Sequence, residues 1–327
     1  LLPQKAAIQL NDTHPAIAVA ELMRRLTDEK MLPWDLAWDI TRATCAYTNH
    51  TILPEALEKW PVQLFESVLP RHLQIIYEIN QRFLSSINLD TEAIRRLSLV
   101  EEEPEKSIRM ANLAIVGSHS VNGVSELHTQ ILKDRVFKDF YHLYPERFNN
   151  KTNGITPRRW LFLCNPRLTR LINRGIGTTW QRDLPKLSKL RTLQHDTAFL
   201  DDLAEVKRQN KLEFCQYFQD IHERELNPES IFDFQAKRIH EYKRQFLNAM
   251  HIVHLIHEIR SGKDIYPHTF FFAGKAAPGY FIAKLIIRLI CHIGEYISRD
   301  PALAKHLQVV FLPNYRVSLA EQIMPAA

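Results

Sequence analysis

Roughly the last hundred residues alternate short apolar runs with long amphipathic segments, and this alternation is the strongest constraint on the fold. Three runs predict β-strands at 231–236, 269–273 and 308–312. The segments after them predict helices that end at Arg260, extend over 279–297 and begin near Val317. A βαβαβ order is typical of a parallel sheet with right-handed helical crossovers. The sequence therefore predicts an α/β fold that includes half of a doubly wound, Rossmann-like sheet.

The limits of this region follow from the residues around it. The chain stops at Pro325-Ala326-Ala327, so we expect the second half of the sheet to be missing, with an unpaired edge and an uncovered apolar face. Residues 149–157 are rich in turn formers, and the pattern changes after them. We therefore place a domain boundary near Thr152, between a domain over 1–152 and a domain over 153–327.

The first domain is predicted to be mainly a helical layer. One short strand is expected at 6–10, and helices are expected from His14, over 35–48 and over 71–84, because their apolar residues recur at helical spacing. The nearly continuous apolar run at 110–117 predicts a strand that is buried on both faces. A further helix is predicted around 127–132.

Composition excludes several classes of function. The 42 Lys and Arg residues exceed the 37 Asp and Glu residues only modestly, and their scatter argues against nucleic-acid binding. No apolar run approaches the roughly 20 residues needed to cross a bilayer, and the N-terminus lacks a signal-peptide pattern. We therefore expect a cytoplasmic protein with neither nucleic acid nor membrane as a partner.

Glycine-rich nucleotide loops and metal sites find little support. The chain has nine glycines, and the segment 274–279 is followed by Tyr280 and Phe281, where a P-loop needs Lys and then Ser or Thr. The Gly175-Ile176-Gly177 segment lacks the third glycine of a dinucleotide fingerprint. The four Cys show no CxxC spacing, and the three His at 251, 254 and 257 lack a further ligand, so no metal is predicted.

Cations follow each of the three strands predicted in the second domain. In an open parallel sheet, ligands bind beyond the carboxyl ends of the strands. Cations have the wrong sign for the positive end of a helix dipole, which disfavours a purely structural role. Their convergence on one crevice would suit a ligand with several phosphate oxygens. The cations that predict this anion site are Lys237, Arg238, Lys243, Arg244, Lys275 and Arg316.

Three motifs of the first domain are ambiguous when they are taken alone. His50 follows a predicted helix and is better explained as a capping or core histidine. The Asn11-to-His14 segment is adequately explained as a helix cap. Asn153-Gly154 could simply form a turn. Composition and spacing alone therefore assign no chemistry to these motifs.

The motifs together resemble the α-glucan phosphorylase family of glycogen, starch and maltodextrin phosphorylases. The blocks follow the family's order over nearly the whole chain, and KRIHEYKRQ at 237–245 is a long, specific match. The other blocks are NDTHP at 11–15, YTNHT at 47–51, LPEAL at 53–57, LPRH at 69–72, KTNGITPRRW at 151–160, GKAAPGY at 274–280 and YRVS at 315–318.

The resemblance implies a GT-B architecture of two Rossmann-like domains, both incomplete in this chain. Residues 1–152 would be the C-terminal part of the N-terminal domain, and residues 153–327 the first part of the cofactor-binding C-terminal domain. The implied activity is that of a hexosyltransferase of glycogen catabolism, which cleaves α-1,4-glucan with inorganic phosphate to give α-glucose 1-phosphate. The implied cofactor is pyridoxal 5′-phosphate, whose phosphate group exchanges a proton with the substrate phosphate, and the implied assembly is a homodimer.

The resemblance also implies roles for individual residues. Arg238 would hold the substrate phosphate and Lys243 would lie near both phosphates. His50 would hydrogen-bond the terminal glucose while its carbonyl stabilises the developing oxocarbenium charge, and Asn153 would bind the 6-hydroxyl. The other substrate-binding residues would be Asp12, His14, Thr51, Tyr242, Lys275 and Tyr280, and the cofactor-binding residues would be Lys237, Arg316, Trp160 and Tyr315.

The chain departs from the family pattern at Ala273, at Arg167, which stands where a small residue is common, and at its C-terminal end. Ala273 stands where the family usually has the first of two glycines before the lysine of the GKAAPGY block. The segment that bears the Schiff-base lysine is expected beyond Ala327, so we predict no turnover by the isolated chain. Two alternatives stay open: a related GT-B glycosyltransferase that uses a sugar nucleotide, and a non-catalytic remnant that binds glucan or a partner.

Overall fold

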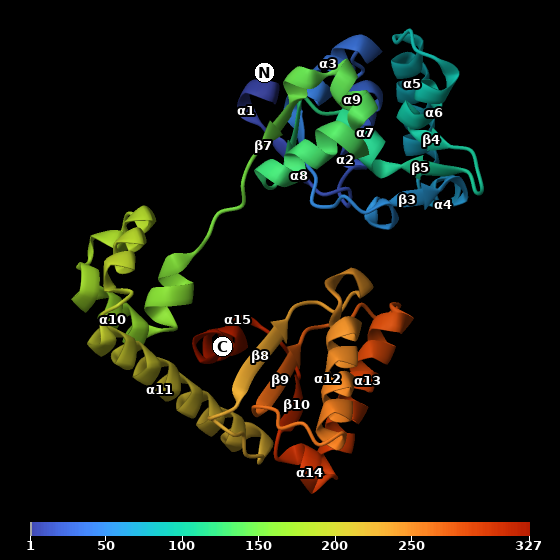
Figure 1. The fold of residues 1–327 in the computed structure, drawn as a ribbon. Coiled ribbons are helices and arrows are strands. Elements are labelled where there is room, and N and C mark those ends of the chain that lie inside the picture. Colours follow the sequence, from blue (N-terminus) through green and yellow to red (C-terminus); the bar gives the residue numbers. More distant parts are fainter. Residues whose placement is uncertain (1) are drawn as a thin grey trace. The chain divides into compact units, whose positions relative to one another are not determined.

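The computed structural model describes residues 2–327 and shows a mixed α/β protein with parallel sheets (Figure 1). Contacts within the chain divide it into two compact units, which we name unit 1 (Leu1–Gly154) and unit 2 (Ile155–Ala327). Each unit has its own sheets and its own hydrophobic core. No helix within residues 2–327 is long and apolar enough to cross a membrane.

Unit 1 is built around a four-stranded parallel sheet in the order β1-β2-β6-β7. Its strands are β1 (Ile8–Asn11), β2 (Cys45–Thr48), β6 (Ser120–Gly123) and β7 (Phe148–Asn150). A small antiparallel sheet contains β3 (Lys59–Pro61), β4 (Val100–Glu101) and β5 (Ser107–Arg109). The helices are α1 (Leu2–Lys5), α2 (Ala18–Arg24), α3 (Trp34–Thr44), α4 (Val62–Val68), α5 (Pro70–Ser85), α6 (Thr91–Leu97), α7 (Met110–Val116), α8 (Glu126–Ile131) and α9 (Lys138–Leu143).

Residues 110–116 form the helix α7, so the strand predicted over 110–117 is wrong. All seven residues of α7 are buried, Asn112 among them, so the helix has no exposed polar face. A fully buried helix and a fully buried strand give the same continuous pattern, which periodicity cannot separate. The parallel strand of this region is β6, which begins at Ser120.

The helical layer predicted for the first hundred residues is also wrong in part, because strands interrupt it. The predicted helix over 35–48 ends at Thr44, where α3 passes directly into β2 without a loop. The helix expected from His14 begins at Ala18, and its N-cap residue Ile17 makes no side-chain capping bond. The polar residues at 11–13 therefore do not cap α2. The helix predicted over 71–84 is confirmed as α5.

Unit 2 confirms the predicted βαβαβ order. Its parallel sheet has the order β10-β9-β8, formed by β8 (Ile231–Ala236), β9 (His268–Ala273) and β10 (Leu307–Leu312). The connecting helices are α12 (Gln245–Arg260) and α13 (Phe281–Ser298), and α15 (Val317–Ala326) follows β10. The other helices of this unit are α10 (Pro166–Ile176), α11 (Thr197–His222) and α14 (Pro301–Ala304).

Both faces of the unit 2 sheet are covered, so the expectation of an uncovered apolar face is wrong. Successive side chains of a strand point to opposite faces, and Phe270 and Phe272 belong to the core that α12 and α13 close. Phe271 lies in a second core with Phe214 of α11 and Leu319 of α15. The long helix α11, which precedes β8, thus covers together with α15 the face that we expected to be exposed.

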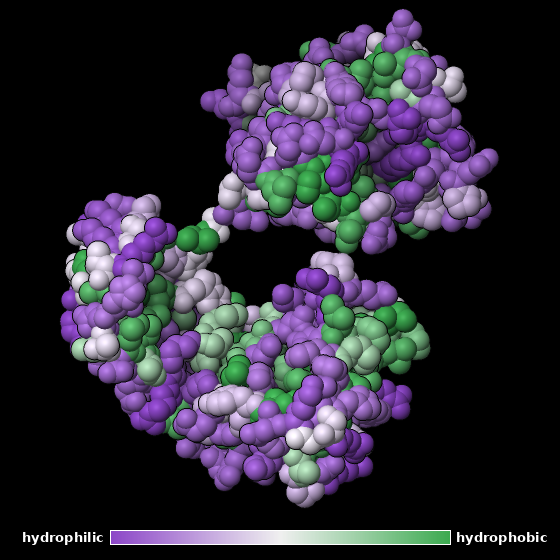
Figure 2. Space-filling model, in the orientation of Figure 1, coloured by the Kyte–Doolittle hydropathy of each residue, from purple (hydrophilic) through white to green (hydrophobic). Residues whose placement is uncertain are grey.

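An exposed hydrophobic patch lies over α12 and α13 (Figure 2). A cleft of about 580 Å³ opens there, beside Glu241 and Arg244 at the start of α12. The apolar residues that line it are Phe246, Leu247, Ile282, Leu285, Ile286 and Leu289.

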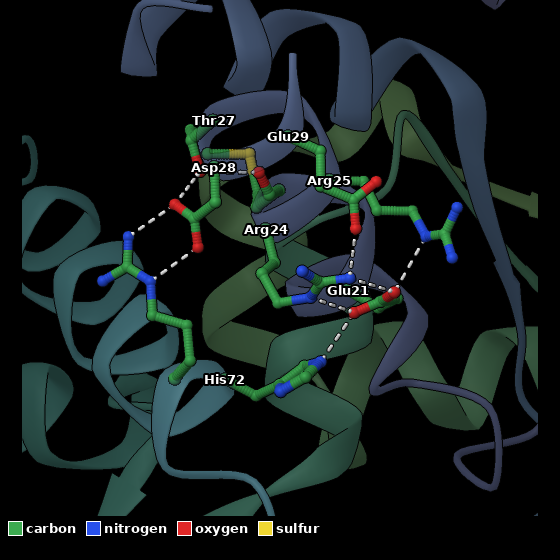
Figure 3. Close-up of polar contacts among 9 residues, drawn as sticks. Glu21, Arg24, Arg25, Thr27, Asp28, Glu29 and His72 are labelled. Carbon is green, nitrogen blue, oxygen red and sulfur yellow. Dashed lines mark hydrogen bonds and ion pairs between the residues drawn. The ribbon is translucent and has the colours of Figure 1, made fainter. Parts of the chain in front are cut away.

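An ion-pair network fixes α2 against α5 in unit 1 (Figure 3). The carboxylate of Glu21 accepts hydrogen bonds from Arg24 Nε at 2.7 Å, from Arg25 Nε at 2.9 Å and from His72 Nε2 at 2.8 Å. Because Arg24 above all stabilises the ionised form, the pKa of Glu21 lies well below its ordinary value. A depressed carboxyl pKa contributes stability above the unfolded-state pKa, and that stability is lost as the pH falls through the folded-state pKa.

We expect Glu21→Gln to lower the free energy of unfolding at pH 7 by about 1 kcal/mol, a value reduced by the solvent exposure of the network. The wild-type chain should lose this contribution progressively as the pH falls below about 4.5, so the difference between the two proteins should shrink on acidification. Urea unfolding at pH 7, 4 and 2.5 measures it. Glu66→Gln, an exposed glutamate on α4, is the matched control. A difference that grows at low pH would contradict the assignment.

Candidate functional site

The three strands of unit 2 end in register, which brings their carboxyl-terminal loops to one edge. Ala273 of β9 pairs with Ala236 of β8 on one side and with Leu312 of β10 on the other. The loops that start there carry Lys237, Arg238, Lys275 and Arg316 as exposed residues, while Lys243 is half-buried. The structure thus brings the predicted cations of unit 2 to the same sheet edge.

The loop that carries Lys237 and Arg238 is held by backbone and side-chain bonds. Lys237 N donates to Ala273 O at 2.9 Å, and Ile239 N donates to Lys275 O at 3.1 Å. The fully buried Gln245 donates from Nε2 to Arg238 O at 3.1 Å and accepts from His240 N at 3.3 Å. Because these bonds involve only the main chain of the loop, the cationic side chains are free to contact a ligand.

The charge of this edge is not balanced by neighbouring carboxylates. None of Lys237, Arg238 and Arg316 takes part in an ion pair in the described part of the chain, and the same holds for Lys243 and Lys275. The nearest acidic residue in sequence, Glu241, accepts from Tyr280 Oη at 2.7 Å instead. Uncompensated cations of this kind favour an anionic ligand, and two phosphate groups in one site would require them.

Aromatic side chains flank the cations at the start of α12. The His240 ring lies 5.1 Å from the Tyr242 ring and 5.6 Å from the Tyr280 ring, measured between centroids. Lys243 Nζ lies 5.5 Å from the centroid of Tyr242, which is 57% exposed. The hydrogen bond to Glu241 raises the pKa of Tyr280. This arrangement keeps the Tyr280 phenol neutral and fixed in orientation.

The two aromatic residues predicted to bind the cofactor lie in different surroundings. Tyr315 follows β10 and packs against the core beneath α11 and α15. Trp160 lies in the π-helical segment η5 (Arg158–Leu163), with its side chain 38% exposed. That segment is tied to α15 by an ion pair between Arg159 and Glu321. Among the described contacts, none joins the Trp160 ring to the strand-end cations.

The carboxyl edge of the unit 1 sheet presents a second group of polar residues. Asn11 pairs with Thr48 at the ends of β1 and β2, and Thr48 pairs with Asn122 of β6. His50 Nε2 lies 2.6 Å from Asn11 Oδ1. Because an amide oxygen only accepts, Nε2 carries the proton, and in a neutral ring Nδ1 then presents a lone pair. His50 is exposed and follows a strand, so it is neither a helix cap nor a core residue.

Asp12 and His14 lie on the loop after β1, beside Glu58. Asp12 has a φ of 69°, and its Oδ1 accepts from Thr13 N at 2.7 Å. The buried Thr13 donates from Oγ1 to Glu58 Oε2 at 2.8 Å, and His14 Nδ1 lies 2.8 Å from Glu58 Oε1. The hydrogen bond to Glu58 raises the pKa of His14. These partly buried and exposed polar bonds therefore stabilise the loop in a strained backbone conformation.

Thr51 and Asn153 complete the polar group of unit 1. Thr51 N donates to Asn49 Oδ1 at 3.0 Å, and Thr51 Oγ1 accepts from Leu53 N at 3.2 Å. Asn153 is exposed, and its backbone N–H donates to Val124 O at 3.0 Å, just beyond β6. The predicted residues of unit 1 therefore gather at one sheet edge. Those of unit 2 follow the strands of another sheet, except Trp160, which lies in η5.

Three residues of this geometry were missed by reasoning from the sequence. Gln245 has a signal, because it begins the buried stripe of α12 that continues with Ala249 and Ile252. Asn11 lies in the NDTHP block, but its contact with His50 could not be predicted from it. Glu58 has no signal, since only the folded loop brings it to His14. Within residues 2–327, no three His, Cys, Asp or Glu side chains are arranged to hold a metal ion.

Comparison with known proteins gives one consistent result over the whole chain. A family model described as "Carbohydrate phosphorylase" matches residues 1–327. The chain is 56% identical to "Glycogen phosphorylase, muscle form" of Homo sapiens and to the protein of the same name from Oryctolagus cuniculus, over 99% of this chain in both cases. It is 54% identical to "Glycogen phosphorylase, brain form" of Mus musculus, again over 99% of the chain. The chain spans 39% of the length of each of these relatives.

Proposed function

The chain belongs to the carbohydrate phosphorylase family, and from this premise we propose that it supplies the phosphate-binding and glucose-binding edges of an α-1,4-glucan phosphorylase. In the proposed reaction the glycosidic bond at C1 of the terminal glucose breaks and a bond from C1 to a phosphate oxygen forms. A phosphate proton passes to the departing 4-hydroxyl, and the product is α-glucose 1-phosphate. The uncompensated cations at the carboxyl edge of unit 2 are the single observation that carries this proposal.

The cations of unit 2 are proposed to bind the phosphates. Arg238 presents a planar guanidinium on a loop whose main chain is fixed by Gln245, so it can bind two phosphate oxygens at once. Lys243 is half-buried beside Tyr242, where its charge is less screened by water than that of an exposed lysine. Together they would stabilise the negative charge of a phosphate that approaches C1. Lys275, Tyr242 and Tyr280 would line the entrance for substrate.

The polar edge of unit 1 is proposed to bind the terminal glucose. His50 has its Nε2–H engaged by Asn11, so Nδ1 can accept from a sugar hydroxyl. Its backbone carbonyl would lie near the ring, where positive charge develops in the transition state. Asn153 would hydrogen-bond the 6-hydroxyl. Asp12, His14 and Thr51 would line the pocket beside this sugar.

Pyridoxal 5′-phosphate is the proposed cofactor, and the residues present fit its phosphate group. Lys237 and Arg316 are exposed at the ends of β8 and β10 and have no acidic partner in the described part of the chain. When bound, the cofactor would supply a phosphate group that exchanges a proton with the substrate phosphate. Lys237 and Arg316 would neutralise that phosphate, and Tyr315 and Trp160 would pack near the ring.

The domain architecture, the cellular location and the oligomeric state follow from the same proposal. Two α/β units, each with a parallel sheet, are consistent with the two Rossmann-like domains of a GT-B protein. Residues 1–152 would then belong to the N-terminal domain and residues 153–327 to the cofactor-binding domain. We further propose that the protein is a cytoplasmic homodimer that acts in glycogen catabolism.

The proposal is tested with the protein expressed from its complete reading frame. Incubation with maltoheptaose, inorganic phosphate and pyridoxal 5′-phosphate should release α-glucose 1-phosphate, detected by ³¹P NMR. Omitting either phosphate or cofactor should abolish the product. Glucan elongation from UDP-glucose, together with no phosphate-dependent product, would favour the sugar-nucleotide transferase instead. Binding of maltoheptaose without any turnover would favour a non-catalytic glucan-binding protein.

A further inference from the structure

Lys243, one of the two residues proposed to bind the reacting phosphate, ends a short turn that leads through Arg244 into α12. The turn is the 3₁₀ segment η8 (Glu241–Lys243). Lys243 N donates to His240 O at 3.2 Å, and Arg244 N donates to Glu241 O at 3.0 Å. Arg244 has a φ of 63°, and its side chain makes no capping bond to α12. This left-handed conformation is unfavourable for arginine, so the contacts around the turn must hold it.

A side chain from the strand before the loop binds the carbonyl of Lys243. Gln235, next to the last residue of β8, donates from Nε2 to Lys243 O at 3.0 Å. Because a backbone carbonyl only accepts, the amide nitrogen of Gln235 must face it, and Oε1 remains free to accept. Asn248, near the start of α12, donates from Nδ2 to this Oε1 at 3.1 Å. The two amides therefore form a directed chain of hydrogen bonds that ends at the main chain of Lys243.

A different amide binds the main chain at Arg238, the other residue proposed to bind the reacting phosphate. The buried Gln245 donates to Arg238 O at 3.1 Å and accepts from His240 N at 3.3 Å. The carbonyls of both cationic residues thus accept from side-chain amides that lie outside the loop 237–244. An amide or carbonyl that loses its partner away from water is costly, so these bonds favour one conformation of the loop.

We propose that Gln235 and Asn248 are positioning residues that act through Lys243. By fixing its main chain, they set the spacing between its ammonium group and the guanidinium of Arg238. The inference rests on the proposed function, in which both cations bind one phosphate. Neither cation takes part in an ion pair within the described residues, so the spacing has to be set through the main chain. A misplacement of about 1 Å at such a site can reduce turnover roughly 100-fold.

A double-mutant cycle in the complete protein tests whether Gln235 acts through Lys243. Gln235→Met keeps the size of the side chain but removes both hydrogen bonds. It should lower kcat/KM for phosphate roughly 10-fold and leave the KM for maltoheptaose unchanged. In a Lys243→Ala background the same substitution should cost less than about 2-fold, because the group that it positions is gone.

Two further variants complete the cycle. Asn248→Ala removes only the bond that orients Gln235, so it should lower kcat/KM for phosphate less than Gln235→Met does. Gln219→Met, at an exposed glutamine of α11, is the matched control and should leave both KM values unchanged. An equal loss from Gln235→Met in both backgrounds would overturn the proposal. A smaller active fraction with an unchanged phosphate dependence would also overturn it, because a purely structural role predicts that result.

Hydrogen exchange of the chain supplies a readout that needs no activity. The amides of Lys243 and Arg244 close the turn, so they should exchange several-fold faster in Gln235→Met than in wild type. The amide of Phe271 in the central strand β9 should exchange equally in both, which shows that the sheet is intact. If Gln235→Met unfolds the sheet, Asn248→Ala should show the same change at a smaller size.

The two experiments separate failure of this inference from failure of the proposed function. Unchanged exchange at Lys243 and Arg244 in Gln235→Met and Asn248→Ala would overturn the inference, whatever the enzyme does. If the wild-type protein shows no phosphorolysis, the proposed function fails. The exchange experiment then still decides whether the amides of Gln235 and Asn248 hold the turn.

Discussion

Gly274→Ala is expected to destabilise unit 2 and to displace the loop that carries Lys237 and Arg238. A Cβ at this position would lie 2.0 Å from Lys237 O and 2.7 Å from Lys237 C, and Gly274 has a φ of 147°. Both contacts are with backbone, so no side-chain rotation relieves them. The ends of β8 and β9 must separate, which strains the bond from Lys237 N to Ala273 O. We expect a loss of about 2–4 kcal/mol in the free energy of unfolding.

The chain provides a matched control in the same loop. A Cβ on Gly279 would meet no heavy atom within 4 Å, and this glycine has no positive φ, so Gly279→Ala should change stability by less than about 0.5 kcal/mol. Urea unfolding of wild type and both variants measures the difference, and equilibrium dialysis with [³²P]phosphate measures anion binding. Equal stability of Gly274→Ala and Gly279→Ala would show that the close approach to Lys237 does not exist in solution.

The sequence predicted unit 2 better than unit 1 for a physical reason. In unit 2 each apolar strand is followed by a loop and then by a helix with one polar face. The hydrophobic pattern of the strand and that of the helix are therefore separated along the chain. In unit 1 α3 runs into β2 without a loop, and α7 is buried on every side. No turn former marks the change from helix to strand after Thr44, and α7 has no exposed polar face. A helix or strand without a polar face shows no hydrophobic period in its sequence, so its type cannot be predicted from that period.

The candidate site shows a similar division. The strand-end cations could be predicted, because strand ends are fixed by the apolar runs themselves. The residues that orient them could not, since Gln245 acts through a fold-dependent bond to Arg238 O. Ala273 stands where the resemblance led us to expect a glycine, and its side chain packs in the core beneath α11 and α15. A Cβ on Gly274, by contrast, would meet the backbone of Lys237. The geometry thus explains why one of the two positions accepts a methyl group and the other does not.

Arg238→Ala is expected to lower kcat/KM for phosphate without changing the fold. The guanidinium is exposed and forms no ion pair in the described part of the chain, so its removal leaves no buried group without a partner. The loop keeps its bonds to Gln245 and to β9, because they involve only main-chain atoms on the loop side. Stability should therefore change by less than about 0.5 kcal/mol.

The expected kinetic effect of Arg238→Ala is large. Loss of a charge-assisted contact made with phosphate in the transition state should cost about 2–3 kcal/mol, or roughly 30- to 150-fold in kcat/KM for phosphate. Arg238→Lys should recover part of this, because it restores the charge but not the planar pair of donors. Lys305→Ala removes an exposed cation at the opposite end of the sheet and serves as the control. Initial rates at varied phosphate and saturating maltoheptaose measure all three variants. If phosphate dependence were the same in Arg238→Ala and Lys305→Ala, the anion site would have to be assigned to the other strand-end cations, since Arg238 would then make no contact with the reacting phosphate.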